Sequence, residues 1–255
     1  VPTTWEELLA AGEKMKAIGK TLLTVSCAGY EVDDYYLPFL WQAGGTVCER
    51  DENGNWVSAM NSEESLAAAK FYCELVEKGY MPAEITGMDF ESVLNSFTAG
   101  ETAMMVAGMW NIATLQACPK WTANGQLLRA GRVPAATPCS VIRIPSTSPS
   151  RANTRKRPAS SCSLLRRRIL RGILHRQRCV PLYQGLRGKQ YAQDPMLKPF
   201  IEDAQYGLNR PATSKYEEFR QLYLCPGVQS MVAGEITPEE FCAQMEQNFN
   251  DLHAG

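Results

Sequence analysis

Acidic residues are missing from one long stretch of this chain, and their absence limits what that stretch can fold into. Between Glu101 and Asp194, 92 consecutive residues contain no Asp or Glu, although they carry three lysines and 13 of the chain's 16 arginines. The stretch has a formal charge of +16, whereas the other 163 residues, with 27 acids and 10 bases, have a charge of −17. Apart from the short run Leu164–Leu174, the apolar residues of 126–188 show no sustained helical or strand period, so we expect these residues to lack a coherent core. Unpaired charges are also costly to bury.

The segments on either side alternate between helical and strand patterns, which is typical of an α/β fold. Before the basic stretch, helical spacing occurs within residues 1–20, 33–45, 61–81, 89–100 and 109–116. Short apolar runs at 21–26 and 101–108 predict strands, and residues 46–60 predict a hairpin that turns at Asn53–Gly54. After the stretch, helical patterns return at 194–207, 214–224 and 237–252.

Capping boxes mark three predicted helix starts. They are formed by the pairs Thr4–Glu7, Asn61–Glu64 and Thr237–Glu240. In the last helix, Phe241, Met245 and Phe249 are spaced for one apolar face, which we expect to pack against the N-terminal half of the chain. Pro226 should interrupt the helix before it, since proline removes a backbone donor.

Catalytic and metal chemistry finds little support in the residue inventory. The only histidines are His175 and His253, the nine cysteines form no C-x-x-C pair, and no glycine-rich phosphate-binding motif occurs. The adjacent carboxylates Asp33–Asp34 and Glu63–Glu64 are predicted to be solvated groups at helix N-termini. No apolar run reaches the roughly 18 residues that span a bilayer. We therefore expect no enzyme activity, no cofactor and no metal.

Aromatic side chains at loops and helix starts are better candidates for a binding site. They are Tyr30, Tyr35, Tyr36, Trp41 and Trp110. Exposed aromatic faces stack on the apolar C–H faces of sugar rings, but core packing is the competing explanation for each of them. Trp110 is the strongest candidate because it follows Gly108 at a predicted turn from strand to helix.

Four motifs resemble the extracellular solute-binding proteins of sugar ABC transporters (family 1, maltose-binding-protein-like). They are TTWEELLAAGEKMKAIGK, FLWQAGG, FTAGETAMMVAGMW and GEITPEEF. The resemblance covers roughly residues 1–118 and 189–255, and it implies a type II, periplasmic-binding-protein-like α/β fold of two lobes, mostly the second lobe here. It also implies truncation at the N-terminus. Residues 1–125 would belong to the second lobe, 126–188 to an anomalous segment of the first lobe and crossover, and 189–255 to helices returning to the second lobe.

The same resemblance implies a non-catalytic protein that delivers an oligosaccharide to membrane permease subunits. Its ligand-binding positions would be Trp110, Tyr35, Tyr36, Asp34, Arg210 and Tyr216. The expected partners are a sugar and the ABC permease, with no nucleic acid, and the expected state is a monomer. The location would be extracellular or periplasmic, with a lipid anchor as an open alternative.

The basic stretch departs from the family pattern, which expects an acidic amphipathic helix where this chain has Arg151–Arg178. Arginine codons read in a shifted frame can encode such a helix, so our hypothesis is a frameshift over about 126–188. Two alternatives stay open. One is a basic nucleic-acid-binding arm, although no Phe, Tyr or Trp lies between Trp121 and Tyr183 to stack on bases. The other is a carbohydrate-active enzyme that uses acids near the aromatic residues.

Overall fold

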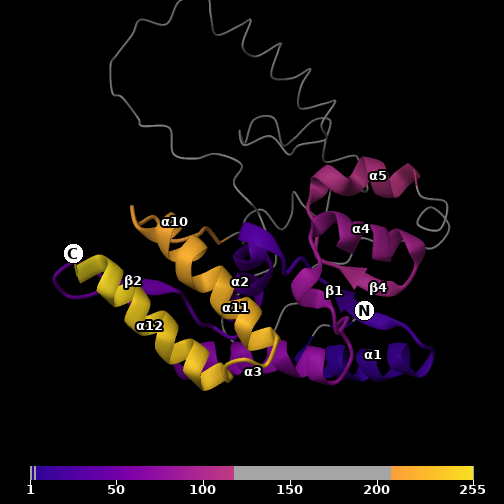
Figure 1. Ribbon diagram of the computed structural model, residues 1–255, viewed down its shortest axis with the longest axis horizontal. Helices are drawn as coiled ribbons and strands as arrows, with labels where there is room; N and C mark the ends of the chain where they lie inside the picture. The colour runs from indigo at the N-terminus through magenta and orange to yellow at the C-terminus, as the bar shows by residue number, and fades with distance from the viewer. Residues whose placement is uncertain (1, 3, 118–207, 255) are drawn as a thin grey trace, which may run out of the picture.

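The N-terminal and C-terminal parts of the chain share one hydrophobic core (Figure 1). The computed structural model describes residues 2, 4–117 and 208–254. Its first part contains α1 (Trp5–Ala17), β1 (Thr21–Thr24), η1 (Gly29–Glu31), α2 (Val32–Gln42), β2 (Cys48–Arg50), β3 (Trp56–Ser58), α3 (Glu63–Glu77), η2 (Ile85–Gly87), α4 (Phe90–Ala99), β4 (Thr102–Met105), η3 (Met109–Asn111) and α5 (Ile112–Ala117). Its second part contains α10 (Tyr216–Phe219), the π-helical turn η5 (Arg220–Leu224), α11 (Cys225–Val232) and α12 (Pro238–Ala254).

The first part contains a parallel pair of strands. β1 and β4 pair in parallel with Thr21 opposite Thr102 and Thr24 opposite Met105. Both strands therefore end at the same edge of the sheet. The predicted hairpin is also present as antiparallel β2 and β3. Gly54 has a φ of 83° in its turn, which explains the glycine there.

Of the three predicted capping boxes, the one at Thr237–Glu240 is confirmed in full and the one at Thr4–Glu7 in part. Thr4 Oγ1 accepts a hydrogen bond from the Glu7 amide at 3.2 Å, and Thr237 and Glu240 exchange the reciprocal bonds of a complete box. The prediction at α3 is wrong by one residue, because Ser62 caps this helix through the Ser65 amide. The side chain that we expected to cap, Asn61, instead donates a hydrogen bond to a carboxylate of α12.

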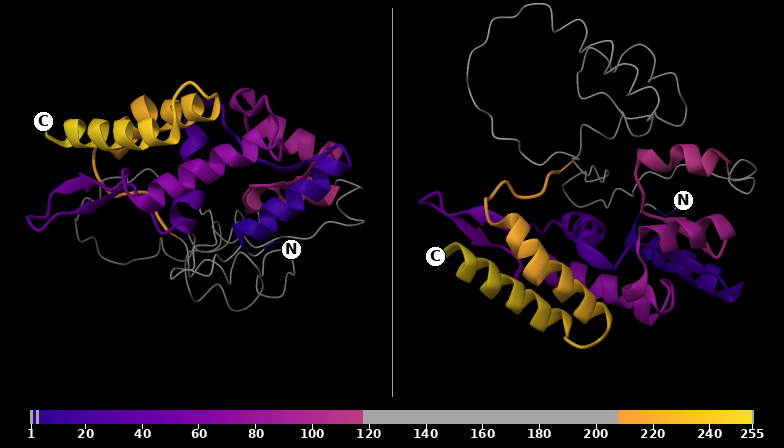
Figure 2. Two further views of the ribbon diagram at one scale, coloured as in Figure 1. Left: turned by 90° about the horizontal axis from the view of Figure 1, so that it is seen from below. Right: turned by 45° about the horizontal axis from the view of Figure 1, so that its top comes forward.

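The C-terminal helix packs on the N-terminal half, as its apolar face predicted. Phe241, Met245 and Phe249 are buried in the same core as the residues of α2 and α3. Figure 2 shows α11 and α12 side by side, with α12 crossing α3 and the hairpin. The prediction that Pro226 interrupts the helix before it is wrong. The backbone stays helical through Leu224 and Cys225, and the proline is accommodated in the first turn of α11 after the π-helical turn.

Several sequence predictions lie outside the described residues. They are the helix within 194–207, the core-free character of 126–188 and every statement about Arg151–Arg178. In the parts that the structure describes, no helix is long and apolar enough to cross a membrane. The five cysteines of those parts are buried free thiols, as expected for residues that pack rather than react.

Candidate functional site

The carboxyl edge of the parallel strands carries the candidate site. β1 leads into η1 and the start of α2, and β4 leads into η3 and α5. Ligands of open α/β sheets bind outside the carboxyl ends of parallel strands, where the backbone and helix starts leave polar groups free. In the described residues, the exposed aromatic side chains are Tyr30 in η1 and Trp110 in η3, so both follow this edge.

Trp110 presents its ring to solvent, with 45% of its surface exposed. The ring lies 6.4 Å from that of Phe90 at a tilted angle, which supports it from the α4 side. A Cβ atom on Gly108 would lie 2.0 Å from the nearest ring atom of Trp110, so only glycine permits this ring position. The sequence prediction of an exposed aromatic after a glycine turn is confirmed, and its role in binding stays a prediction.

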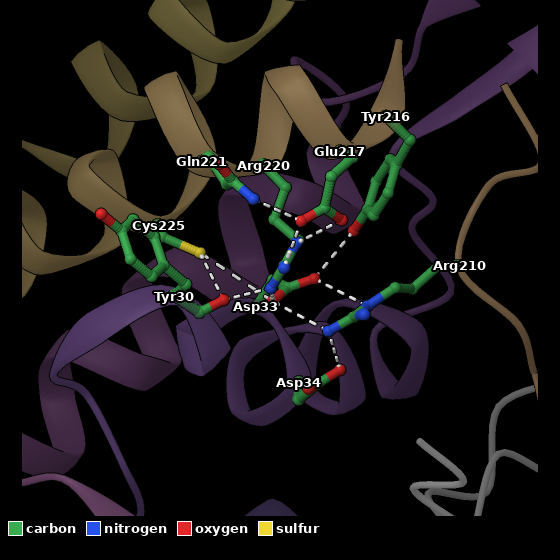
Figure 3. Close-up of polar contacts among 9 residues, drawn as sticks. All are labelled: Tyr30, Asp33, Asp34, Arg210, Tyr216, Glu217, Arg220, Gln221 and Cys225. Carbon is green, nitrogen blue, oxygen red and sulfur yellow. Dashed lines mark hydrogen bonds and ion pairs between the residues drawn. The ribbon is translucent and has the colours of Figure 1, made fainter. Parts of the chain in front are cut away.

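Asp33 is the centre of a buried polar cluster at the N-terminal end of α2 (Figure 3). Its Oδ2 lies 2.9 Å from Arg210 Nε and accepts a hydrogen bond from the Tyr216 hydroxyl at 3.2 Å. Its Oδ1 accepts a bond from Arg220 Nη1 at 3.1 Å. The expectation of solvated carboxylates is wrong for Asp33–Asp34, because Asp33 has no exposed surface and Asp34 has 7%. It is right for the exposed pair Glu63–Glu64 of α3.

Asp34 sits next to this cluster and forms its outer part. Its Oδ1 pairs with Arg210 Nη2, and only 7% of its surface is exposed. Burial and, second, the neighbouring Asp33 raise the pKa of Asp34 to about 6, while Arg210 opposes the shift. Arg210 itself retains 23% side-chain exposure. The Asp34–Arg210 pair is therefore a part of the cluster that a ligand could reach.

The other predicted aromatic positions are buried or, for Trp41, partly buried against the core. Tyr35 and Tyr36 have 2% and 0% exposure, so the expectation that they are exposed is wrong. The Tyr36 ring makes edge contacts with those of Tyr72 and Phe241 in the core. Tyr216 is also buried, with its hydroxyl donated to the Asp33 cluster. These three tyrosines lie behind the reachable surface and support it.

The segment that carries Arg210 is tied to the rest of the fold at a second point. Thr213 Oγ1 lies 2.6 Å from His253 Nε2, a hydrogen bond to the end of α12. The His253 ring stacks on Phe249 at 4.1 Å. Arg210 therefore reaches α2 from a segment that is anchored at both the ion-pair cluster and the C-terminal helix.

Sequence reasoning missed Arg220, which completes the cluster. Its guanidinium binds the Glu217 carboxylate at 2.6 Å and 3.1 Å and donates to the backbone carbonyl of Tyr30. The hydrogen bond from Arg220 holds the pKa of Glu217 below its usual value. The sequence does carry one signal for it, which is that arginine is rare outside the acid-free stretch.

The described residues have an α/β fold of the periplasmic-binding-protein-like, type II class, as the sequence predicted. Residues 2–119 match the family model of the bacterial extracellular solute-binding protein. The family resemblance found in the sequence is therefore confirmed over these residues.

Individual relatives agree with the family match. Binding proteins of Brucella abortus (strain 2308) and Brucella suis biovar 1 (strain 1330) are each 30% identical over 107 residues, which are 41% of this chain and 25% of the relative. The chain thus spans about a quarter of these relatives. An ABC transporter solute-binding protein of Thermotoga lettingae TMO, bound with α-D-tagatose, is similar in structure with a TM-score of 0.75 and 22% identity, over 98% of this chain and 64% of that one.

Proposed function

We propose that this protein is the solute-binding component of an ABC transporter and that its solute is a carbohydrate, which it binds without transforming. The observation that carries the proposal is the exposed Trp110 ring, held against Gly108 at the carboxyl end of β4. A sugar-bound protein of the same fold, with tagatose as its ligand, supports a carbohydrate.

In the proposed binding mode, the sugar ring stacks on Trp110 and its hydroxyls meet the Asp34–Arg210 pair. The carboxylate accepts hydrogen bonds from hydroxyls, and the guanidinium donates them. Tyr35, Tyr36 and Tyr216 act behind this surface, where they keep the start of α2 in place. Neither an acid–base pair nor a metal is needed for binding of this kind.

The proposed partners and location follow from the family. The protein would act outside the cell membrane or in the periplasm and hand its solute to permease subunits in the membrane. We further propose that the described residues mostly form the second lobe of a two-lobe protein, that it acts as a monomer, and that residues 1–125 and 189–255 belong to that lobe.

Saturation-transfer NMR with D-tagatose, D-glucose and maltotriose tests the proposal directly. One stacking ring and one ion pair give an affinity near 1 mM, about −4 kcal/mol, so titrations should extend to tens of millimolar sugar. At least one sugar should receive saturation on its ring protons from the folded wild-type chain. Trp110→Ala should weaken this binding at least about tenfold, about 1.4 kcal/mol.

Trp56→Ala is the matched control for the loss of an indole. Trp56 is a half-buried tryptophan on the hairpin, where its ring lies under the Arg50 guanidinium at 4.2 Å. This variant should bind sugar like the wild type. Absence of saturation transfer to all three sugars, or equal binding by the Trp110→Ala variant, would contradict the proposed function.

A further inference from the structure

We propose that Tyr30 is a second aromatic contact of the ligand site and that Arg220 is the residue that positions it. This inference rests on the proposed function, because it concerns the same carboxyl edge of β1 and β4. It assigns a ligand contact to η1 and a positioning role to a guanidinium that has no access to the ligand.

The Tyr30 side chain is free while its backbone is fixed. The residue is 67% exposed, the largest exposed fraction among the large hydrophobic side chains that the structure describes. Gly29, just before it, has a φ of 79°, which lets the chain turn sharply between β1 and α2. The turn therefore presents a phenol ring from a fixed backbone, so a ligand that stacks on the ring has to order only the side-chain torsions of Tyr30.

Two contacts connect the Tyr30 turn to the Trp110 side of the site. The amides of Cys27 and Ala28 donate hydrogen bonds to the Met88 carbonyl at 2.9 Å and 3.1 Å. Met88 is followed closely by Phe90, whose ring contacts that of Trp110. Both exposed aromatic residues are thus attached to the start of α4, which places them along one edge of the sheet.

Arg220 holds the Tyr30 turn through its backbone carbonyl (Figure 3). Its Nη1 donates to the Tyr30 carbonyl and to Asp33 Oδ1, and Glu217 binds the opposite side of the guanidinium. Cys225 Sγ also lies 3.7 Å from the same carbonyl. A planar guanidinium with five donors can bridge a carboxylate and a carbonyl in this way, whereas an ammonium group has no fixed fork.

The arrangement predicts coupling between Arg220 and Tyr30 in ligand binding. A lysine at position 220 would keep the positive charge beside Asp33 but lose the fork that also reaches the Tyr30 carbonyl. The Tyr30 ring would then sample more orientations, and the ligand would have to order it. The effect of Arg220→Lys on ligand affinity should therefore depend on the presence of the Tyr30 ring.

Dissociation constants for the sugar that binds wild type should be measured by NMR titration for Tyr30→Ala, Arg220→Lys and the double variant. We expect Tyr30→Ala to weaken binding about threefold to tenfold and Arg220→Lys to weaken it by a similar factor. The double variant should be no weaker than Tyr30→Ala alone, which a general structural role of Arg220 would not produce. Leu222→Ala, an exposed change in η5, is the control and should bind like wild type.

The results distinguish the Tyr30 contact, the positioning role of Arg220 and the proposed function. If Arg220→Lys does not fold, Glu217→Gln replaces it, because this change removes a partner of the guanidinium from an exposed position. Wild-type affinity in Tyr30→Ala, together with lost binding in Trp110→Ala, would overturn the inference and leave the proposed function intact. Independent, multiplying effects of the two changes would overturn the positioning role. Failure of wild type to bind any of the sugars would overturn both.

Discussion

Replacing Asp33 by asparagine should remove a large part of the stability of this fold. The carboxylate is fully buried and interacts with Arg210, Arg220 and Tyr216. An amide of the same shape keeps one acceptor oxygen but places an NH₂ group against the donors of these residues. It also leaves the two guanidinium groups without the anion that they share. Breaking a buried ion pair costs about 3–5 kcal/mol. Because Arg220 keeps Glu217 and Arg210 keeps Asp34, we expect the lower end, about 3 kcal/mol.

Urea denaturation followed by far-UV circular dichroism measures this loss. With an m-value of about 2 kcal/mol/M, the midpoint of Asp33→Asn should fall by about 1.5 M relative to wild type. Asp34→Asn is the matched control, because it removes the neighbouring charge at a position where the ionised form is already disfavoured. It should not lower the midpoint at pH 7.5. A midpoint for Asp33→Asn within 0.3 M of wild type (about 0.6 kcal/mol) would refute the reasoning.

Three further changes probe single features of the structure. Gly108→Ala should displace the Trp110 ring and weaken sugar binding at least about threefold, with a changed near-UV dichroism spectrum. Thr237→Ala should cost about 1 kcal/mol in urea denaturation, because it removes one half of the capping box of α12. Burial raises the pKa of Asp34 from 3.8 to about 6, so its stabilising protonated form is fully present below about pH 3.8 and is lost as the pH rises through 6. Between pH 4 and 7, the urea midpoint of Asp34→Asn should therefore fall less than that of wild type.

Elements governed by local rules could be predicted from the sequence. Thr4 and Thr237 cap the helices that their spacing indicated, and the hairpin turns at Gly54. The error at α3 has a tertiary cause. Asn61 and Ser62 are both good caps by type, but Asn61 Nδ2 donates to Glu246 on α12, 185 positions away, and leaves Ser62 for the helix.

The pairing of β1 with β4 also lay beyond sequence reasoning, and the site depends on it. Strand patterns at 21–26 and 101–108 indicated two strands but gave no register or direction for them. Once the strands are parallel neighbours, the turns after them meet at one edge. The turns that carry Tyr30 and Trp110, which are far apart in the sequence, therefore both follow the carboxyl edge of the sheet.

The burial of Asp33 follows from a property of α2 that helical periodicity in the sequence does not capture. Residues Val32 to Leu40 are all buried, so this helix has no solvent face that could accept a charged pair. A carboxylate on such a helix requires a buried cationic partner, and arginine serves this role better than lysine. Outside the acid-free stretch the chain has only Arg50, Arg210 and Arg220, and the last two bind Asp33. Two of these three arginines are therefore used to neutralise one buried anion.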